Sequence, residues 1–349
     1  MQLFGALAGL VLLGVVILDV FGTVFVPRGG AGVSTRHLYA TVWASSSWVS
    51  SRSGPHRRAV LALAGPILLP LTVAVWVVGL VTAFTLIYLP YTLQLSVPQG
   101  EPGWTAPIYT SAYAATTLGV GDIYATTPLL RLLITVEAGL GFALFSIGIT
   151  YVLSVYGALL RATALALHIT SFIGRQAGED AVDVVCRSVK THSEEQTLAW
   201  LRQVVSELAT TAQAQAQYPL IAYFHIPRDD RALPLALIDL LELLTVCRTL
   251  PDPLAYPSLT SGPTLVWAWR LTTTFVLEHA DQIPSTDEGA TEDSRLGAYL
   301  RTRERLMAAG IALRHDDEAR SGYLALRGQW SSAGRGLLDH FGYQHRPDA

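Results

Sequence analysis

The sequence predicts an all-α membrane protein in which three transmembrane helices are followed by a helical cytosolic domain. Only 15% of its 349 residues are charged, against roughly 25% in soluble domains. The shortage is uneven, because residues 59–100 contain no Asp, Glu, Lys or Arg, and Asp19 is the only charged residue within 3–26. A bilayer core requires about 20 consecutive apolar residues. These runs exclude a wholly soluble enzyme, and a net charge of −3 without a basic cluster disfavours a nucleic-acid binder.

The first span, residues 3–26, is expected to be a permanent transmembrane helix. No basic segment precedes it, it is too long for the apolar part of a signal peptide, and no small-residue cleavage site follows it. A carboxylate inside a bilayer is costly. We therefore expect Asp19 to pack against protein near the cytoplasmic end of this helix, and we favour that interpretation over a functional role.

The loop after the first span, residues 27–58, indicates the orientation of the chain. It carries five arginines and no acidic residue, a bias typical of cytoplasmic loops. Tyr39, Trp43 and Trp48 recur in it at roughly helical spacing. This pattern predicts a short helix in the membrane interface, with its tryptophans at the level of the lipid headgroups.

Two further spans complete the predicted topology, at residues 59–91 and 129–160. The segment between them begins with residues 95–107, which contain no Lys or Arg and are expected on the external side. The predicted protein therefore crosses the cell membrane three times, with its amino terminus outside and its carboxy terminus in the cytoplasm.

Residues 104–128 lie between the second and third spans and are too short to cross the bilayer twice. Pro107 is suited to the first turn of a helix over 108–116. Glycines then alternate with other residues in Thr117-Leu118-Gly119-Val120-Gly121. Glycine allows the left-handed backbone angles that turn successive carbonyls to one side, and such non-helical backbone at membrane depth must be satisfied by protein or water. We therefore predict a re-entrant helix and loop.

This region resembles the pore module of prokaryotic potassium channels, whose selectivity filter reads Thr-Val-Gly-Tyr-Gly. The likeness covers residues 1–165 and is concentrated in 104–160. It implies that backbone carbonyls replace the water shell of K⁺, with Leu118 and Val120 packing outward against the pore helix. The implied filter residues are Thr117, Leu118, Gly119, Val120 and Gly121. The resemblance also implies that Tyr109 and Asp122 support the filter.

Two positions depart from the family pattern, and a third matches it. Val120 stands where an aromatic residue is usual, and Tyr109 stands where a tryptophan is usual, so selectivity for potassium over sodium stays open. Gly141 matches the hinge glycine of the inner helix and is the expected gating hinge. Close helix packing is an equal alternative for this glycine. Phe145 and Ile149 follow on the same face as candidates for lining the pore or for packing in the membrane.

One such loop per chain implies that four chains line the pore, and hence a homotetramer in the lipid bilayer. The expected function is passive, potassium-selective conduction, with K⁺ as the permeant ion and no cofactor. Two alternatives are kept. One is a weakly selective cation channel. The other is a non-conducting membrane scaffold or sensor with a degenerate pore module.

The carboxy-terminal half is expected to be a cytosolic helical bundle that regulates or assembles the pore, for which an unidentified regulatory ligand is possible. Helical patterns occur at residues 193–217, 233–250, 263–280, 291–314 and 316–341. The acidic run at 315–318 is better explained as a helix start than as a metal site. Cys186 and Cys247 are expected to be ordinary thiols, and we find no catalytic set that would indicate an enzyme. The predicted domains are 1–58, 59–161 and 162–349.

Overall fold

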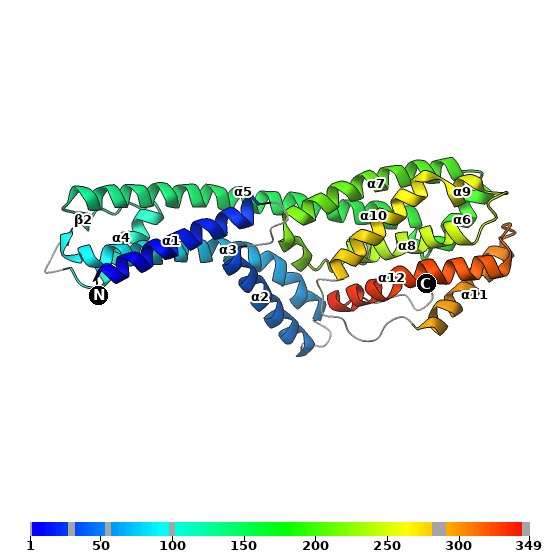
Figure 1. Ribbon diagram of the computed structural model, residues 1–349, viewed down its shortest axis with the longest axis horizontal. Coiled ribbons are helices and arrows are strands. Elements are labelled where there is room, and N and C mark those ends of the chain that lie inside the picture. Colours follow the sequence, from blue (N-terminus) through cyan, green and yellow to red (C-terminus); the bar gives the residue numbers. More distant parts are fainter. Residues whose placement is uncertain (1, 27–31, 53–56, 98–101, 281–290, 344–349) are drawn as a thin grey trace. The chain divides into compact units, whose positions relative to one another are not determined.

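The computed structural model describes residues 2–26, 32–52, 57–97, 102–280 and 291–343, which are almost entirely helical (Figure 1). Three helices are long and apolar enough to span a membrane: α1 (Gln2–Val24), α3 (Arg57–Tyr88) and α5 (Pro128–Ile173). The all-α class and the three apolar helices are thus confirmed. The third helix continues past the predicted end at residue 160, because no proline or glycine interrupts the chain before Gly174.

Contacts divide the chain into two compact units. The first comprises Met1–Arg52, Leu63–Gly157 and Gln215–Phe224, and the second contains the remainder. The predicted segments 1–58 and 59–161 therefore fall largely in one unit. Gln215–Phe224, which we assigned by sequence to the last domain, also packs in the first unit. Aromatic side chains account for this, since Tyr223 lies against Tyr39 and Trp43 at ring-centroid distances of 5.6 and 5.7 Å.

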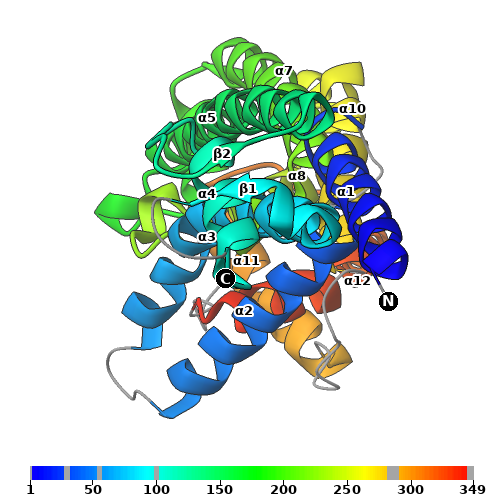
Figure 2. The same cartoon turned by 90° about the vertical axis from the view of Figure 1, so that its left-hand side faces the viewer.

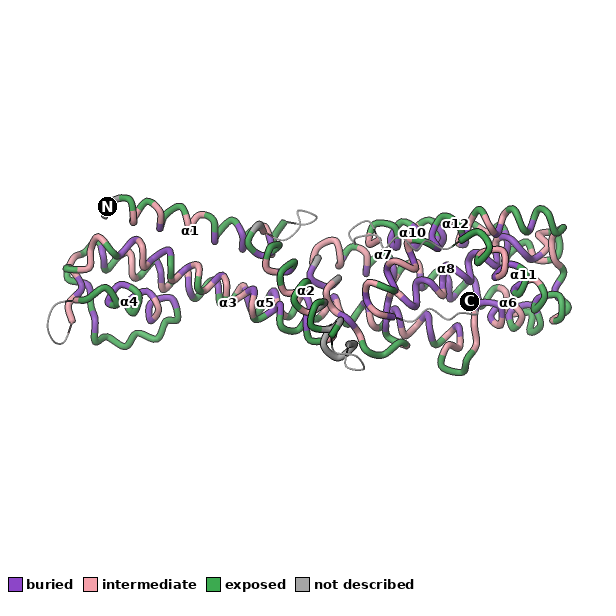
Figure 3. The backbone as a smooth tube through the Cα atoms, turned by 90° about the horizontal axis from the view of Figure 1, so that it is seen from below, coloured by how far each residue is buried: buried purple, intermediate pink, exposed green. Residues whose placement is uncertain are grey.

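Helices α1 and α3 pack closely in the first unit because small residues face each other. A Cβ on Gly9 of α1 would collide with the Ala83 carbonyl and with Ile87, and one on Gly79 of α3 would collide with Val16. Glycines at such contacts allow backbones to approach within a membrane, where lipid is as apolar as leucine. The opposite side of α1 is largely exposed (Figure 3).

The carboxylate of Asp19 links α1 to α2 (Val33–Arg52) through hydrogen bonds. Its Oδ1 atom accepts hydrogen bonds from the backbone N–H groups of Ser34 (2.8 Å) and Thr35 (3.4 Å). Its Oδ2 atom accepts from the Thr35 hydroxyl (2.6 Å) and from the Trp76 indole (3.0 Å). Asp19 therefore caps the start of α2 and also binds α3. This confirms the expectation that the carboxylate serves helix packing.

The interfacial helix predicted within 27–58 corresponds to α2, but its aromatic residues do not all face outward. Tyr39 is buried and its hydroxyl forms a 2.9 Å hydrogen bond with the hydroxyl of Tyr151 on α5. Trp48 is 60% exposed, and the Arg52 guanidinium lies 3.8 Å from its ring centroid. One end of α2 is thus anchored to the unit through Tyr39, whereas Trp48 is largely exposed.

The segment between α3 and α5 contains several short elements. These are the 3-10 helix η2 (Leu89–Gln94), strand β1 (Leu95–Ser96), helix α4 (Thr105–Ala115) and strand β2 (Tyr124–Ala125). The two strands pair antiparallel, with Leu95 opposite Ala125. Figures 1 and 2 show α4 lying between α3 and α5.

The second unit is a helical bundle arranged around α8 (Leu233–Thr249), whose side chains are almost all buried. Five predicted helices are confirmed here: α7 (Glu194–Gln217), α8, α10 (Pro263–Ala280), α11 (Glu292–Ala308) and α12 (Asp316–Phe341). Four further elements of this unit, not predicted from the sequence, are η3 (Arg175–Ala177), α6 (Ala181–Lys190), η5 (Asp229–Arg231) and α9 (Pro257–Ser261). The 3-10 helix η4 (Pro219–Tyr223), also not predicted, belongs to the first unit.

Candidate functional site

The candidate site begins where α4 ends. This helix starts one turn before the predicted residue 108, with Pro107 in its first turn. After Ala115 the chain leaves the helix: the N–H of Thr117 donates to the Ala114 carbonyl (3.0 Å), and the N–H of Leu118 donates to the Tyr113 carbonyl (2.9 Å). These two bonds fix the direction in which the next residues depart.

The backbone of the predicted filter segment alternates in handedness. Positive φ angles occur at Thr117 (55°), Gly119 (59°) and Gly121 (81°), whereas Leu118 and Val120 have negative φ. A positive φ in a β-branched residue such as threonine is unusual, and strain of this kind is concentrated at functional positions. Alternation turns successive carbonyl groups toward the same side of the chain, the arrangement that a line of carbonyl ligands requires.

The segment is exposed in the isolated chain, with Leu118 at 71% and Val120 at 50%. Their expected packing against a pore helix stays a prediction, because only one of the proposed four copies is present. Within the described residues, the carbonyl oxygens of 117–121 accept no hydrogen bond. Carbonyls left unpaired at membrane depth need water, ions or further protein around them.

Aromatic side chains of α4 hold the far end of this segment. The Tyr113 hydroxyl donates to the Ile123 carbonyl at 2.7 Å, and the rings of Tyr113 and Tyr109 lie 5.5 Å apart. The Tyr109 side chain interacts with the Asp122 carboxylate, which also accepts from the N–H of Ile123 at 3.0 Å. Tyr109 and Asp122 were predicted from the sequence, whereas Tyr113 was not. The available signal for Tyr113 was its spacing, one helical turn after Tyr109.

The chain beyond Ile123 is anchored to the end of η2. The N–H and the hydroxyl of Thr126 both donate to the Gln94 carbonyl, at 2.9 and 2.7 Å. The Arg131 guanidinium donates to the Ala125 carbonyl at 3.0 Å. Together with the β1–β2 pairing, these bonds anchor the chain where it leaves the 117–121 segment.

Gly141 lies directly behind α4. It is buried, and a Cβ at this position would overlap the Ala115 carbonyl, so only glycine permits this approach. Helix α5 continues without interruption from Pro128 to Ile173. The close contact accounts for a glycine here, and the role of gating hinge stays a prediction. Phe145 and Ile149, further along α5, are 62% and 49% exposed.

A buried carboxylate that was not predicted from the sequence as a site residue joins the three helices around the site. Glu137 of α5 has no exposed surface. Its Oε2 atom accepts from the Tyr88 hydroxyl of α3 at 2.6 Å, and its Oε1 atom lies 2.5 Å from the Ser111 hydroxyl of α4. Its partners are 49 and 26 residues distant in the chain, so no local pattern in the sequence indicates them.

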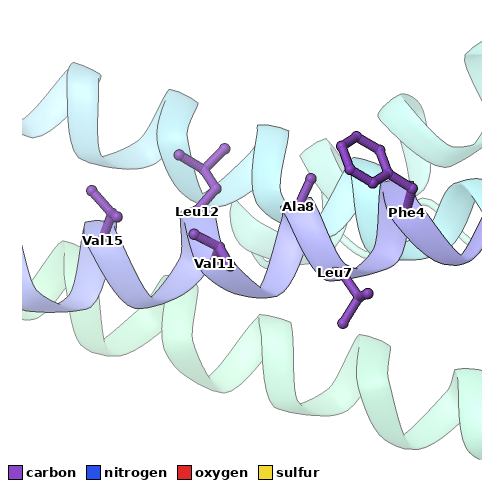
Figure 4. A pocket seen from close by; sticks show the side chains of 6 residues that line it. All are labelled: Phe4, Leu7, Ala8, Val11, Leu12 and Val15. Atoms are coloured by element: carbon purple, nitrogen blue, oxygen red, sulfur yellow. The ribbon is translucent and has the colours of Figure 1, made fainter.

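A groove of about 460 Å³ runs along α1 and is lined by six apolar side chains (Figure 4). They are Phe4, Leu7, Ala8, Val11, Leu12 and Val15. The groove offers no polar group that would orient a specific ligand, and such a surface is suited to lipid acyl chains.

Contacts within the second unit account for the acidic run 315–318 and for Cys247. Among the described residues, no group of three His, Cys, Asp or Glu side chains is placed to hold a metal ion. In the acidic run 315–318, Asp316 accepts a hydrogen bond from the Tyr299 hydroxyl (2.9 Å) and pairs with Arg303. Burial raises the pKa of Cys247 to about 12, which leaves its thiol unreactive at neutral pH.

Comparison with known proteins supports the membrane assignment and nothing more specific. The chain is 28% identical over 242 residues to an uncharacterized membrane protein of Bacillus subtilis (strain 168), YdjJ, covering 69% of this chain and 68% of that protein. No family model matches, and no solved structure matches. Likeness to a membrane protein, together with the three apolar helices, supports a membrane protein with transmembrane helices.

Proposed function

We propose that four copies of this chain form a potassium-selective channel in the cell membrane, with residues 117–121 of each copy lining a passive ion path. The single observation that carries the proposal is the alternation of φ at Thr117, Gly119 and Gly121. It lies in a segment that follows a short helix, between two apolar helices. Backbone carbonyls turned to one side are the ligands that replace the hydration shell of K⁺.

The unpaired carbonyls also support the tetramer. One chain supplies one row of carbonyls, which cannot surround an ion, and the row is exposed in the isolated chain. Fourfold symmetry would bring four rows together around an axis and would cover Leu118 and Val120 by neighbouring copies. The carboxyl end of α4 points its negative dipole toward the start of the segment, which favours cations there.

In the proposed orientation the basic α1–α2 loop, α2 and the second unit lie in the cytoplasm, and the amino terminus lies outside. The arginines of the loop support this side. Val120 favours one alternative, a weakly selective cation channel, because no aromatic ring stands at this position to brace the segment.

The test is ion flux into liposomes that contain the purified protein. We expect a potassium flux that Gly119→Asp abolishes, since a side chain at φ +59° distorts the backbone and adds a charge to the ion path. Gly103→Asp is the matched control, because Gly103 is exposed, has space around it and has no positive φ. The absence of flux, or a flux that Gly119→Asp leaves unchanged, would contradict the proposal. Reversal potentials in mixed sodium and potassium separate selective from weakly selective conduction.

A further inference from the structure

Glu137 is a buried ionisable group that ion conduction through carbonyls does not use. It touches all three helices that enclose the candidate site: its own α5, α3 through Tyr88 and α4 through Ser111. Ser111 makes a second contact, 3.0 Å from the Val81 carbonyl of α3. Four groups are thus connected in one chain of hydrogen bonds inside the first unit.

Counting the protons in this chain favours a protonated carboxyl group at Glu137. A carbonyl only accepts, so the Ser111 hydroxyl must supply the proton between itself and Val81, and it has a single proton. The 2.5 Å contact between Ser111 and Glu137 then needs a proton from the carboxyl group. A protonated Glu137 donates to Ser111 and accepts from Tyr88, which satisfies every contact. An ionised Glu137 would take the Ser111 proton away from Val81.

The surroundings also favour an uncharged group. Among the described residues, no cation pairs with Glu137; the nearest arginine on its own helix, Arg131, binds the Ala125 carbonyl. The titratable groups that face it are the phenols of Tyr88 on α3 and Tyr113 on α4. A carboxylate without a counter-ion inside a membrane protein is strongly disfavoured, whereas a neutral acid with both oxygens bonded is not.

The contact pattern connects this carboxyl group to the filter segment. Glu137 and Gly141 are one turn apart on α5, and they touch Ser111 and Ala115, which are one turn apart on α4. The two helices therefore contact each other at two successive turns. The second contact, at Ala115, lies two residues before Thr117. On the same helix, Tyr113 holds the other end of the segment through Ile123.

We propose that Glu137 is a protonated positioning residue, which clamps α4 between α3 and α5 and so fixes the carbonyl row of residues 117–121. This role in the ion path rests on the proposed channel function, but the protonation and the clamp can be tested without it.

The experiment compares Glu137→Gln and Glu137→Ala with wild type in the full-length purified protein. Infrared spectroscopy of wild type is expected to show the C=O band of a buried carboxylic acid at neutral pH, and Glu137→Gln is expected to lose it. Glutamine keeps a donor for Ser111 and an acceptor for Tyr88, so its flux and thermal stability should stay close to wild type. Glu137→Ala removes both bonds and should lower flux about tenfold or more. Thr135→Val, at an exposed hydroxyl on α5, is the control.

A pH profile supplies the second measurement. Raising the pH ionises Glu137, which then accepts the Ser111 proton in place of the Val81 carbonyl. Wild-type flux should therefore fall at alkaline pH, while the flux of Glu137→Gln should not change with pH. Absence of the acid band, or identical pH profiles when wild type and Glu137→Gln both conduct, would overturn the proposal. If the band is present and depends on Glu137 but no variant conducts, the protonated clamp stands and the channel function fails.

Discussion

The two units of this chain place polar and apolar side chains in opposite ways. In the first unit, large apolar residues such as Phe4 (77%) and Leu7 (54%) are exposed, while Asp19 (4%) and Glu137 (0%) are buried. In the second unit, the leucines of α8 are buried and charged residues mostly lie outside. The proposed placement of the first unit in lipid and of the second in water accounts for the difference. Lipid removes the hydrophobic contribution to helix association and leaves close packing and hydrogen bonds, whereas water makes apolar burial dominant.

One cluster in the second unit does not follow this division. Glu242 of α8 accepts hydrogen bonds from Tyr323 (2.8 Å) and from Arg327, and all three side chains are buried. The guanidinium also lies 5.6 Å from the Trp330 ring centroid. Replacing buried ion pairs by apolar groups often leaves stability unchanged. The cluster is therefore better interpreted as fixing the position of α12 on α8 than as the main source of the stability of the bundle.

The largest effect is expected from the apolar core of the second unit. Leu244 of α8 has no exposed surface. Leu244→Ala removes buried methyl groups and leaves a cavity, at a cost of about 2–5 kcal/mol in the free energy of unfolding. Thermal unfolding followed by circular dichroism measures it. Leu254→Ala is the control, because Leu254 is 91% exposed; equal effects of the two changes would contradict an apolar core around α8.

The second unit also shows which elements sequence patterns can predict. Prolines, caps and helical periodicity mark its long helices: α10 begins at Pro263, and Thr291 caps α11 by accepting from the N–H of Ser294 at 3.3 Å. Helix α6 was missed because its valines favour a strand. Its available signal was a capping box, in which Asp180 and Asp183 each accept a backbone N–H of the other.

In the first unit the sequence predicts the spans and the site segment but not what holds them. The alternation of glycines in 117–121 is local, so it is readable from the sequence. The bonds of Glu137 with Tyr88 and Ser111, and the contact of Gly141 with Ala115, join residues far apart in the chain. Such pairings depend on how helices pack side by side, which periodicity does not specify.

An intermediate effect is expected at Asp19, where the first unit relies on hydrogen bonds. Asp19→Ala removes the cap of α2 and leaves the Trp76 indole without its acceptor, so α2 should lose about 2 kcal/mol of local stability. Hydrogen–deuterium exchange of the α2 backbone amides measures this loss. Asp19→Asn keeps an oxygen for the cap, so the stability of its α2 should lie between those of wild type and Asp19→Ala. Unchanged exchange in Asp19→Ala would show that α2 is held by its aromatic contacts alone.

The smallest effect is expected on the exposed face of α1. Leu7 is 54% exposed and lies in the groove shown in Figure 4. Because acyl chains are as apolar as leucine, Leu7→Ala should change stability in lipid nanodiscs by less than about 0.5 kcal/mol. Thermal unfolding in the nanodiscs provides the measurement.

A substitution on the other face of α1 is the comparison for Leu7→Ala. Gly9 lies two residues away and meets the backbone of Ala83, so Gly9→Leu forces α1 away from α3 and should lower the unfolding temperature clearly. A small response at Leu7 with a large one at Gly9 means that one face of α1 meets lipid and the other meets protein. A loss at Leu7→Ala as large as at Leu244→Ala would mean that protein covers this face as well. The opposite placement of apolar side chains in the two units would then disappear in the assembled molecule.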